Sequence, residues 1–349
     1  MSDAQTADEA SRKAAFESKI AALLRRLPGA LEAAGCRPLS GGAMQEMWMV
    51  AAKAKGGDGA TAQRLFVLRR LIGAAETRSD FALDLEKEAE LLRAAARCGV
   101  PSPEVAHVLT PEDGLGRGYL MSHVPGETIP QKIFKTEALI PALDGLAAQC
   151  GAALARIHAM PLDGLEFLQA FTPKSRLAML RENYELTGPP RPVYEYAFRW
   201  LDERVGAMPA RQALIHGDFR FGNLMIDSGG VAAVLDWELA HICDPIEDLG
   251  WLCTPSWRFG RIEKPVGGFG DIEDLRAGYV EAGGAPFDDE QLLFWIVYGA
   301  LFWGVTCRGF AKGFVAGEKI VERGVIGRRA SEVEIDLLCL LDPRGVRLC

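Results

Sequence analysis

The sequence predicts an α+β fold of two lobes, in which an N-terminal antiparallel sheet with a helix precedes a larger and mainly helical lobe. The 349 residues exceed the roughly 100–200 residues of one ordinary domain. Residues 37–71 alternate strand-like runs with glycine-rich turns, which indicates an antiparallel meander. After Pro125-Gly126 helical patterns dominate. We therefore expect an N-terminal lobe at residues 1–124 and a C-terminal lobe at residues 125–349.

The N-terminal lobe is expected to begin with a helix and to continue as strands. Apolar residues at helical spacing predict a helix at Phe16–Ala34, and Gly35 stands where glycine commonly ends a helix. A second helix at Phe81–Cys98 should stop before Pro101, because proline cannot continue it. The expected strands are Arg37–Ala52 folded at Gly41-Gly42, Arg64–Leu71 after a tip at Gly56–Gly59, Glu104–Leu109 and Gly118–Val124.

The C-terminal lobe is expected to be helical around one compact β segment. Its most apolar run, Gln291–Cys307, is shorter than the roughly 20 residues that a membrane span needs. A buried helix and no membrane partner are therefore expected there. The other expected elements are helices near Ile140–Met160 and within Tyr184–Val205, strands at Ala213–His216, Asn223–Ile226 and Val231–Leu235, and helices between Pro245 and Leu341.

Composition excludes some classes of function. The net charge of −8 and the pI near 5.4 disfavour a nucleic-acid partner, which would require a basic surface. The eight cysteines are scattered without a C-x-x-C pair, which argues against a zinc site or a redox motif and fits reduced thiols in a cytoplasmic protein. Residues 1–15 are polar and acidic and lack the apolar core of a secretory signal.

The strongest signal is the string His216-Gly-Asp-Phe-Arg-Phe-Gly-Asn223, followed by Asp236-Trp237-Glu238. It resembles the catalytic core of the aminoglycoside phosphotransferase and choline kinase-like superfamily. The protein-kinase patterns H-R-D-x-x-x-x-N and D-F-G have the same internal spacing. The resemblance implies a bilobal, protein-kinase-like fold, ATP or GTP with Mg²⁺ as cofactors, and a small-molecule alcohol as phosphate acceptor.

The resemblance assigns a role to each polar residue of this string. Asp218 would accept the proton of the acceptor hydroxyl, and Asn223 and Asp236 would hold Mg²⁺ through hard oxygen ligands. Glu238 would add a water-mediated metal contact. We interpret Arg220 as a contact to the γ-phosphate, with a surface salt bridge as the alternative. The competing interpretation of the whole string is a hairpin whose Asp and Asn side chains only cap turns.

The N-terminal lobe carries further matches to the kinase template. Arg69 stands on the third strand where most kinases have the lysine that grips the α- and β-phosphates, and Glu88 is its expected ion-pair partner, with Glu86 and Glu90 as competitors. A solvated helix face is the alternative for these acids. The remaining candidates for nucleotide contacts are Ser40, Gly41 and Gly42 at the first hairpin, through backbone N–H groups, and Met121, Ser122, His123 and Val124 at the expected adenine-binding hinge.

Several other residues are expected to support the loop rather than to react. We expect His216, His158 and Asp248 to brace it, and Asp244-Pro245-Ile246-Glu247 to begin a helix with a capping Asp and a Glu at the third position. The tryptophans of the C-terminal lobe fit helix core better than a cage for a cation. These are Trp251, Trp257, Trp295 and Trp303.

Within the superfamily, L-R-R on the third strand, the arginine-containing loop and D-W-E-L-A are most similar to the kinase-like domains related to those fused to acyl-CoA dehydrogenases. The resemblance extends from Leu39 to the end of the chain and favours a hydroxyacid or hydroxyacyl-CoA as acceptor. The alternatives are a kinase for a cationic alcohol, of the aminoglycoside or choline type, and a nucleotide-binding pseudokinase. A protein kinase is disfavoured, because the step from Asp236 to Asp244 leaves no room for an activation loop. The sequence leaves the acceptor, the nucleotide and the oligomeric state open.

Overall fold

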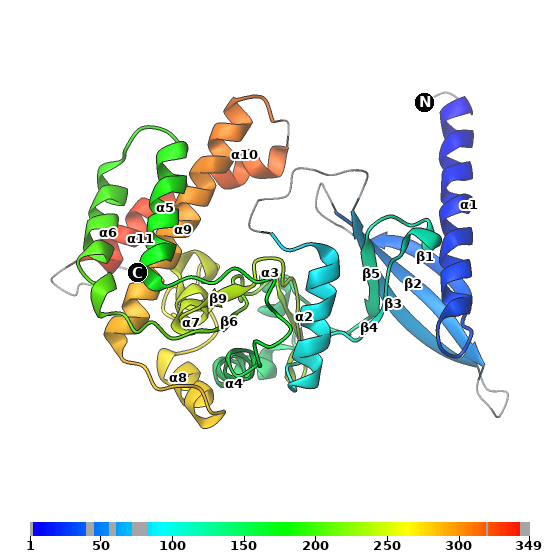
Figure 1. Cartoon of the computed structure of the whole chain (residues 1–349), viewed down its shortest axis with the longest axis horizontal. Helices are drawn as coiled ribbons and strands as arrows, with labels where there is room; N and C mark the ends of the chain where they lie inside the picture. The colour runs from blue at the N-terminus through cyan, green and yellow to red at the C-terminus, as the bar shows by residue number, and fades with distance from the viewer. Residues whose placement is uncertain (1–2, 40–44, 56–60, 72–81, 319, 343–349) are drawn as a thin grey trace. The chain divides into compact units, whose positions relative to one another are not determined.

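The chain divides into two compact units in a computed structural model that describes residues 3–39, 45–55, 61–71, 82–318 and 320–342. Residues 1–96 and 102–124 form the N-terminal unit, and residues 97–101 and 125–349 form the C-terminal unit (Figure 1). One boundary between them falls after Val124.

The N-terminal unit is built on one antiparallel sheet, whose described strands have the order β1-β2-β3-β5-β4. The predicted meander is confirmed, since β1 pairs with β2 and β2 with β3 along nearly their whole lengths. The predicted turn at Gly41-Gly42 and the tip at Gly56–Gly59 lie outside the described residues. The strands are β1 (Glu32–Leu39), β2 (Gln45–Lys55), β3 (Thr61–Leu71), β4 (Val105–Val108) and β5 (Gly118–Ser122).

The helix predicted at Phe16–Ala34 is wrong at both ends. The observed helix α1 is Asp3–Arg26, and the chain after it turns through Pro28 and Gly29, where φ is +90°. Proline stops the helix, because it lacks the N–H that the helix would use. Gly35 lies instead at a register shift in β1, with φ of +130°. The leucines read as helical up to Leu31 therefore continue past the end of α1.

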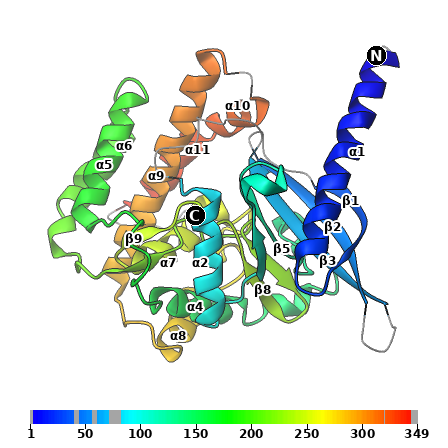
Figure 2. The same ribbon diagram turned by 45° about the vertical axis from the view of Figure 1, so that its right-hand side comes forward.

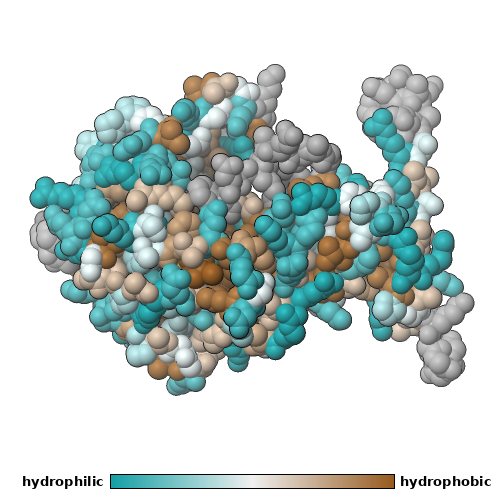
Figure 3. All heavy atoms as spheres, viewed as in Figure 1, coloured by the Kyte–Doolittle hydropathy of each residue, from teal (hydrophilic) through white to brown (hydrophobic). Residues whose placement is uncertain are grey.

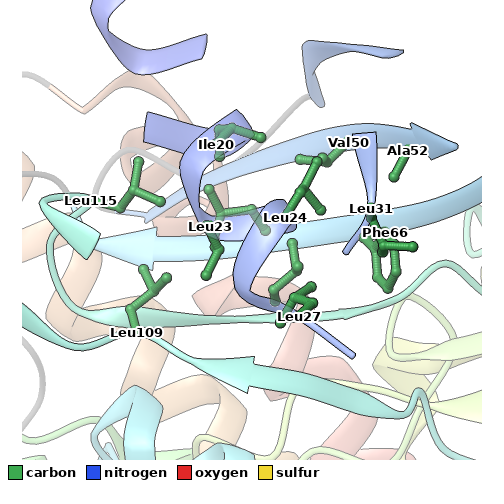
Figure 4. Packing of buried hydrophobic residues seen from close by; sticks show 12 residues of the cluster. Ile20, Leu23, Leu24, Leu27, Leu31, Val50, Ala52, Phe66, Leu109 and Leu115 are labelled. Atoms are coloured by element: carbon green, nitrogen blue, oxygen red, sulfur yellow. The ribbon is translucent and has the colours of Figure 1, made fainter. Parts of the chain in front are cut away.

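The core of the N-terminal unit lies between α1 and the sheet. Ile20, Leu23 and Leu24 of α1 are almost fully buried, and they belong to one apolar cluster with Val50 of β2 and Phe66 of β3 (Figure 4). Figure 1 and Figure 2 both show α1 running across the strands β1, β2 and β3. This packing buries the face of the sheet that α1 covers and holds β3 in place against the helix.

The second helix of the N-terminal unit, α2, is Leu85–Arg97, shorter than the predicted Phe81–Cys98. Phe81 lies outside the described residues. The helix buries Glu88 along with Leu85, Ala89, Leu91 and Leu92. A buried glutamate on an otherwise apolar face requires a partner of opposite charge.

The C-terminal unit is mainly helical, as predicted. The predicted helix at Ile140–Met160 is divided into a short 3₁₀ turn and α4, because Gly145 between them has φ of +79°. The described helices are α3 (Pro130–Ile133), α4 (Leu146–His158), α5 (Pro173–Leu186), α6 (Pro192–Asp202), α7 (Ile246–Cys253), α8 (Ile272–Glu281), α9 (Asp289–Val315), α10 (Val321–Gly327) and α11 (Ala330–Leu340).

Two small antiparallel sheets carry the loop singled out in the sequence. Strand β6 (Ala213–Ile215) pairs with β9 (His241–Cys243), and β7 (Leu224–Asp227) pairs with β8 (Gly230–Val234). The strand β9 was not predicted from the sequence. Its pairing with β6 brings the chain that follows Asp236 back beside the start of the loop.

The helix α9 is a central packing element of the C-terminal unit. Helices α5, α6, α7, α10 and α11 all contact it. Its 27 residues are long and apolar enough to cross a membrane by length and composition, but 72% of the apolar window is buried inside the protein. The predicted buried helix at Gln291–Cys307 is confirmed, and it extends further in both directions than the apolar run.

Candidate active site

The candidate catalytic loop runs from the end of β6 to the start of β7. Phe219 and Phe221 are fully buried and alternate with Asp218 and Arg220, which keep partial exposure. Gly217 opens the loop with φ of +82°, and a Cβ at this position would lie 2.4 Å from a backbone carbonyl oxygen. Only glycine fits there. The alternation of buried and exposed residues and the glycine together determine that the loop presents the side chains of Asp218 and Arg220.

Asp248 of α7 holds the loop from behind. Its carboxylate accepts hydrogen bonds from the backbone N–H groups of His216 (2.8 Å) and Gly217 (2.9 Å). Nε2 of His158 lies 3.1 Å from Oδ2 of Asp248, and Nδ1 of the same ring lies 2.9 Å from the hydroxyl of Tyr279. The prediction that His158 and Asp248 brace the loop is confirmed.

The His216 ring is a second brace and is fully buried. Its Nδ1 accepts the backbone N–H of Asp218 (3.2 Å), and its Nε2 donates to the carbonyl of Leu235 (3.0 Å). This pattern requires a neutral ring. Burial lowers the pKa of His216, and the neighbouring carboxylates oppose that shift. The ring therefore links the start of the loop to the segment just before Asp236, as a bracing residue should.

The Asp218 carboxylate receives four N–H groups. Arg220 donates to it through Nε (2.8 Å) and Nη2 (3.0 Å), Asn223 through Nδ2 (2.6 Å) and Trp251 through Nε1 (2.9 Å). The Arg220 guanidinium also lies 4.6 Å from the centre of the Trp257 ring. In this structure Arg220 is therefore paired with the predicted base, and its predicted contact to the γ-phosphate stays a prediction.

Trp251 and Trp257, which the sequence predicts to be helix core, contact Asp218 and Arg220 in the structure. Trp251 is three residues after Asp248 on α7, and residues at that spacing share a helix face. Once Asp248 was expected to brace the loop, that spacing was the signal that could have placed Trp251 beside it. No comparable signal exists for Trp257, which follows in a 3₁₀ turn.

The predicted metal ligands Asn223 and Asp236 are brought close by the backbone. The N–H of Leu235, the residue before Asp236, donates to the carbonyl of Asn223 (2.8 Å). The Asn223 amide nitrogen bonds to the backbone carbonyl of Asp218 (2.9 Å) as well as to its carboxylate, which leaves the amide oxygen as the ligand atom. Asp236 has φ of +63°, a conformation that Asp adopts more readily than most residues.

These donors fit Mg²⁺, which prefers oxygen ligands and commonly takes one or two from protein carboxylates. The amide oxygen of Asn223 and the carboxylate of Asp236 supply such a pair, and Glu238 lies two residues further on. The left-handed backbone at Asp236 is a sparsely populated conformation of the kind that clusters at functional sites. The metal roles of the three residues stay predictions.

In the N-terminal unit, Arg69 and Glu88 form a buried ion pair. Nη1 of Arg69 lies 3.0 Å from Oε1 of Glu88, and its Nε donates to Oε1 of Gln45 (2.8 Å). Of the two competing acids, Glu86 pairs with Arg117 and Glu90 is exposed. The predicted pair of Arg69 with Glu88 is confirmed, and its contact with phosphates stays a prediction.

The predicted adenine hinge lies at the end of β5. The N–H groups of Ser122 and His123 donate to the carbonyls of Glu104 (2.8 Å) and Leu65 (3.0 Å). Within the described residues, the N–H of Val124 donates to no other group. Val124 is thus the available backbone donor of the predicted set, in which Met121 belongs to the β5 ladder. Ser40, Gly41 and Gly42 lie outside the described residues.

The start of α7 differs from the predicted capping pattern. Asp244 does cap, since its Oδ1 accepts the N–H of Ile246 (2.9 Å), but Glu247 instead forms a buried ion pair with Arg176, whose Nε lies 3.0 Å away. Burial tends to raise the pKa of Glu247, and Arg176 and His241 lower it more strongly. His241, Cys243 and Glu247 lie close enough together to be considered as ligands of one metal ion. The Arg176 guanidinium bound to Glu247 opposes the binding of a cation there.

The fold and the loop define a kinase-like phosphotransferase. The family model described as "Phosphotransferase enzyme family" matches residues 35–295. This match covers well over half of the sequence, and the chain therefore belongs to the phosphotransferase enzyme family.

The chain is similar to several known proteins. The mouse acyl-CoA dehydrogenase family member 10 is 28% identical over 205 residues, which are 55% of this chain and 18% of that protein. A putative aminoglycoside phosphotransferase from Ralstonia eutropha has a TM-score of 0.68 at 19% identity, with 92% of this chain and 96% of that chain covered. An aminoglycoside phosphotransferase in ternary complex with AMP-PNP and hygromycin B has a TM-score of 0.58 at 16% identity, with 91% and 98% covered.

Proposed function

We propose that the protein transfers the terminal phosphoryl group of ATP to a hydroxyl group of a small-molecule metabolite. The observation that carries this proposal is the braced loop, which presents the Asp218 carboxylate beside Asn223 and next to the chain that bears Asp236. Phosphoryl transfer requires an oriented nucleophile and neutralised phosphates and little covalent work by the protein. The family relation and the AMP-PNP complex of a solved neighbour support ATP, and GTP is the alternative.

Asp218 acts on the acceptor hydroxyl. Its carboxylate accepts a hydrogen bond from the hydroxyl, directs the oxygen at the γ-phosphorus and takes the proton as the new O–P bond forms and the bond from the γ-phosphorus to the departing ADP breaks. Asn223 and Trp251 hold the carboxylate in place through their N–H groups. Mg²⁺, when held by Asn223 and Asp236, would neutralise the charge on the nucleotide phosphates.

Arg220 exchanges partners during the reaction. Its guanidinium lies on the Asp218 carboxylate, and the hydroxyl of the acceptor needs that same carboxylate. A phosphate group of the nucleotide offers the guanidinium a bidentate partner of higher charge. Movement of Arg220 to the phosphate, along the face of Trp257, frees Asp218 for the acceptor. In the N-terminal unit, Arg69, held by Glu88, contacts the α- and β-phosphates.

For the acceptor we favour a hydroxyacid or a hydroxyacyl-CoA. The similarity to acyl-CoA dehydrogenase family member 10 supports this choice, although the match covers only 18% of that protein. A cationic alcohol is the second candidate, because Trp251 contacts Asp218 and the ring of Trp257 lies 5.1 Å from that of Trp251. It is less well supported, since the face of Trp257 already carries the Arg220 guanidinium. The seven cysteines within the described residues are free thiols, which fits a cytoplasmic location.

The test is a phosphate-transfer screen with ATP and Mg²⁺ over hydroxyacids, their CoA thioesters, choline and aminoglycosides. Asp236→Ala should abolish transfer to whichever acceptor reacts, because it removes a carboxylate ligand from the metal site. Asp227→Ala is the matched control, since within the described residues the Asp227 carboxylate accepts one hydrogen bond, from the turn N–H of Gly229. Near-normal transfer by Asp236→Ala would show the metal assignment to be wrong. Nucleotide binding without transfer to any acceptor would favour the pseudokinase.

A further inference from the structure

Apart from the candidate active site, a pocket lies in the C-terminal unit where α9, α10 and α11 meet the loop between α5 and α6. Its volume is about 580 Å³, within the range of small-molecule sites. Its lining includes four basic residues and no acidic one, although the chain as a whole has a net charge of −8. The basic residues are Arg191, Arg308, Lys312 and Arg328.

Arg308 is the central cation of this pocket and is only 7% exposed. Its Nη2 donates to the carbonyl of Pro189 (2.7 Å), and its guanidinium lies 4.7 Å from the centre of the Tyr184 ring. Its Nη1 is buried and has no hydrogen-bond partner within the described residues. A buried charged donor without an acceptor is costly, because it has lost its bonds to water. Arg308 lines the pocket and keeps its guanidinium over the rings of Tyr184 and Tyr194, so that an anion in the pocket would face a buried positive charge without a carboxylate partner within the described residues.

Two of the other three cations lack an acidic partner within the described residues. Arg328 is exposed and has neither a hydrogen bond nor an ion pair from its side chain within the described part of the chain. Lys312 donates to the carbonyl of Leu186 (2.6 Å), which leaves two N–H groups of its ammonium. Arg191 pairs with Glu334 (3.0 Å). The pocket therefore retains an excess of positive charge.

Apolar side chains lie at the edge of the same pocket. Val315 lines it and is 87% exposed, and Leu186, whose carbonyl holds Lys312, is 68% exposed. Figure 3 shows hydrophobic atoms at the surface where α9 ends and α10 follows. A ligand that combines an anionic group with an apolar portion fits this combination better than a bare inorganic ion does.

We propose that this pocket binds a phosphate-bearing small molecule, with Arg308 as the buried donor and Lys312 and Arg328 as flanking charges. A planar guanidinium can bind two phosphate oxygens at once, and those of Arg308 and Arg328 have no carboxylate partner within the described residues. The site is separate from Asp218, and its occupancy does not depend on the proposed phosphoryl transfer. The phosphate belongs either to the acceptor itself or to a separate ligand.

The pocket and the candidate active site share α9. Phe302 of α9 lies 5.7 Å from the ring of Trp251, which binds Asp218, and Arg308 is six residues further along. Six residues of helix correspond to about 9 Å. Six residues also turn the helix by about 240°, so that Arg308 and Phe302 lie on different faces of α9.

The experiment measures binding of pyrophosphate, as a probe, by calorimetry without nucleotide or Mg²⁺. Lys312→Gln combined with Arg328→Gln should weaken binding at least tenfold, because both changes remove charge from exposed positions of the pocket. Lys174→Gln combined with Arg156→Gln is the matched control, with the same loss of charge at exposed positions elsewhere in the unit. Arg308→Lys, which keeps the charge and loses the planar fork, should also weaken binding while the melting temperature stays within a few degrees.

Equal affinities of the pocket variant and the control variant for pyrophosphate would overturn the proposal. Binding would then depend on the total charge of the protein and not on the residues of the pocket. Once an acceptor is known, its KM in the same variant identifies the source of the phosphate. A raised KM with unchanged kcat means that the acceptor carries the phosphate. An unchanged KM with lost pyrophosphate binding means a separate ligand. Both results support the pocket and are independent of whether the proposed acceptor class is right.

Discussion

Two arginine–carboxylate pairs, one in each unit, differ in how they are held. Arg69 and Glu88 are 19 residues apart in sequence, and their side chains are 9% and 0% exposed. Arg220 and Asp218 are two residues apart, and their side chains are 26% and 15% exposed. The first pair joins a strand to a helix, and the second is contained in one loop.

The difference indicates two kinds of task. The pair in the N-terminal unit has taken two charges out of water, so that removal of either partner leaves an uncompensated buried charge. The pair in the loop is local and partly solvated, and such pairs contribute about 0–1 kcal/mol to stability. The pair of Arg69 with Glu88 is suited to keep one geometry. The pair of Arg220 with Asp218 is suited to separate when Arg220 moves to another partner. The predictions below separate stability from turnover on this basis.

The largest effect is expected from Asp218→Asn. The amide cannot take the hydroxyl proton, and turnover should fall by about 10²–10⁴-fold, the usual contribution of a general base. ATP affinity and the melting temperature should change little, because the loop is braced through backbone groups and Asp248. Single-turnover transfer and ATP binding, measured on the same variant, check this. Unchanged transfer would remove Asp218 from the mechanism, and lost ATP affinity would make it a structural residue.

Glu88→Gln should mainly affect stability. It leaves the buried Arg69 guanidinium without its countercharge and should lower the free energy of unfolding by about 3–5 kcal/mol. Glu86→Gln, on the same helix and paired with the exposed Arg117, is the matched control and should cost no more than about 1 kcal/mol. Chemical unfolding measures the loss in free energy of unfolding for both variants, and hydrogen exchange within the sheet is a second measurement of it. Equal losses in the two variants would contradict the distinction between the pairs.

Arg220→Gln should have the smallest effect on stability and a moderate effect on the reaction. We expect the melting temperature to remain within a few degrees and the KM for ATP to rise about tenfold, the equivalent of one charged hydrogen bond of about 1.4 kcal/mol. Steady-state kinetics at saturating acceptor separates KM from kcat. A large loss of stability with an unchanged KM for ATP would show that Arg220 only supports the loop.

The sequence predicted the features that depend on spacing within one segment. The loop from His216 to Asn223 follows from residue types at fixed intervals, whereas the brace from Asp248 and the pair of Arg69 with Glu88 were implied by the resemblance to the kinase template. The strand β9 and the placement of Trp257 depend on contacts between segments distant in the chain, for which a single sequence has no signal. The end of α1 differs from the predicted end because the apolar spacing continues past Pro28, whereas proline stops the helix.

The brace behind the loop has a consequence for the redesign of this protein. Asp248, His158 and Tyr279 fix the position of Gly217 from α7, α4 and α8. None of these three contacts comes from α10 or α11. Residues on those two helices, which line the basic pocket, can therefore be exchanged without touching the hydrogen bonds that brace the loop of Asp218. Binding at that pocket can be changed in this way while the support of the reactive carboxylate is retained.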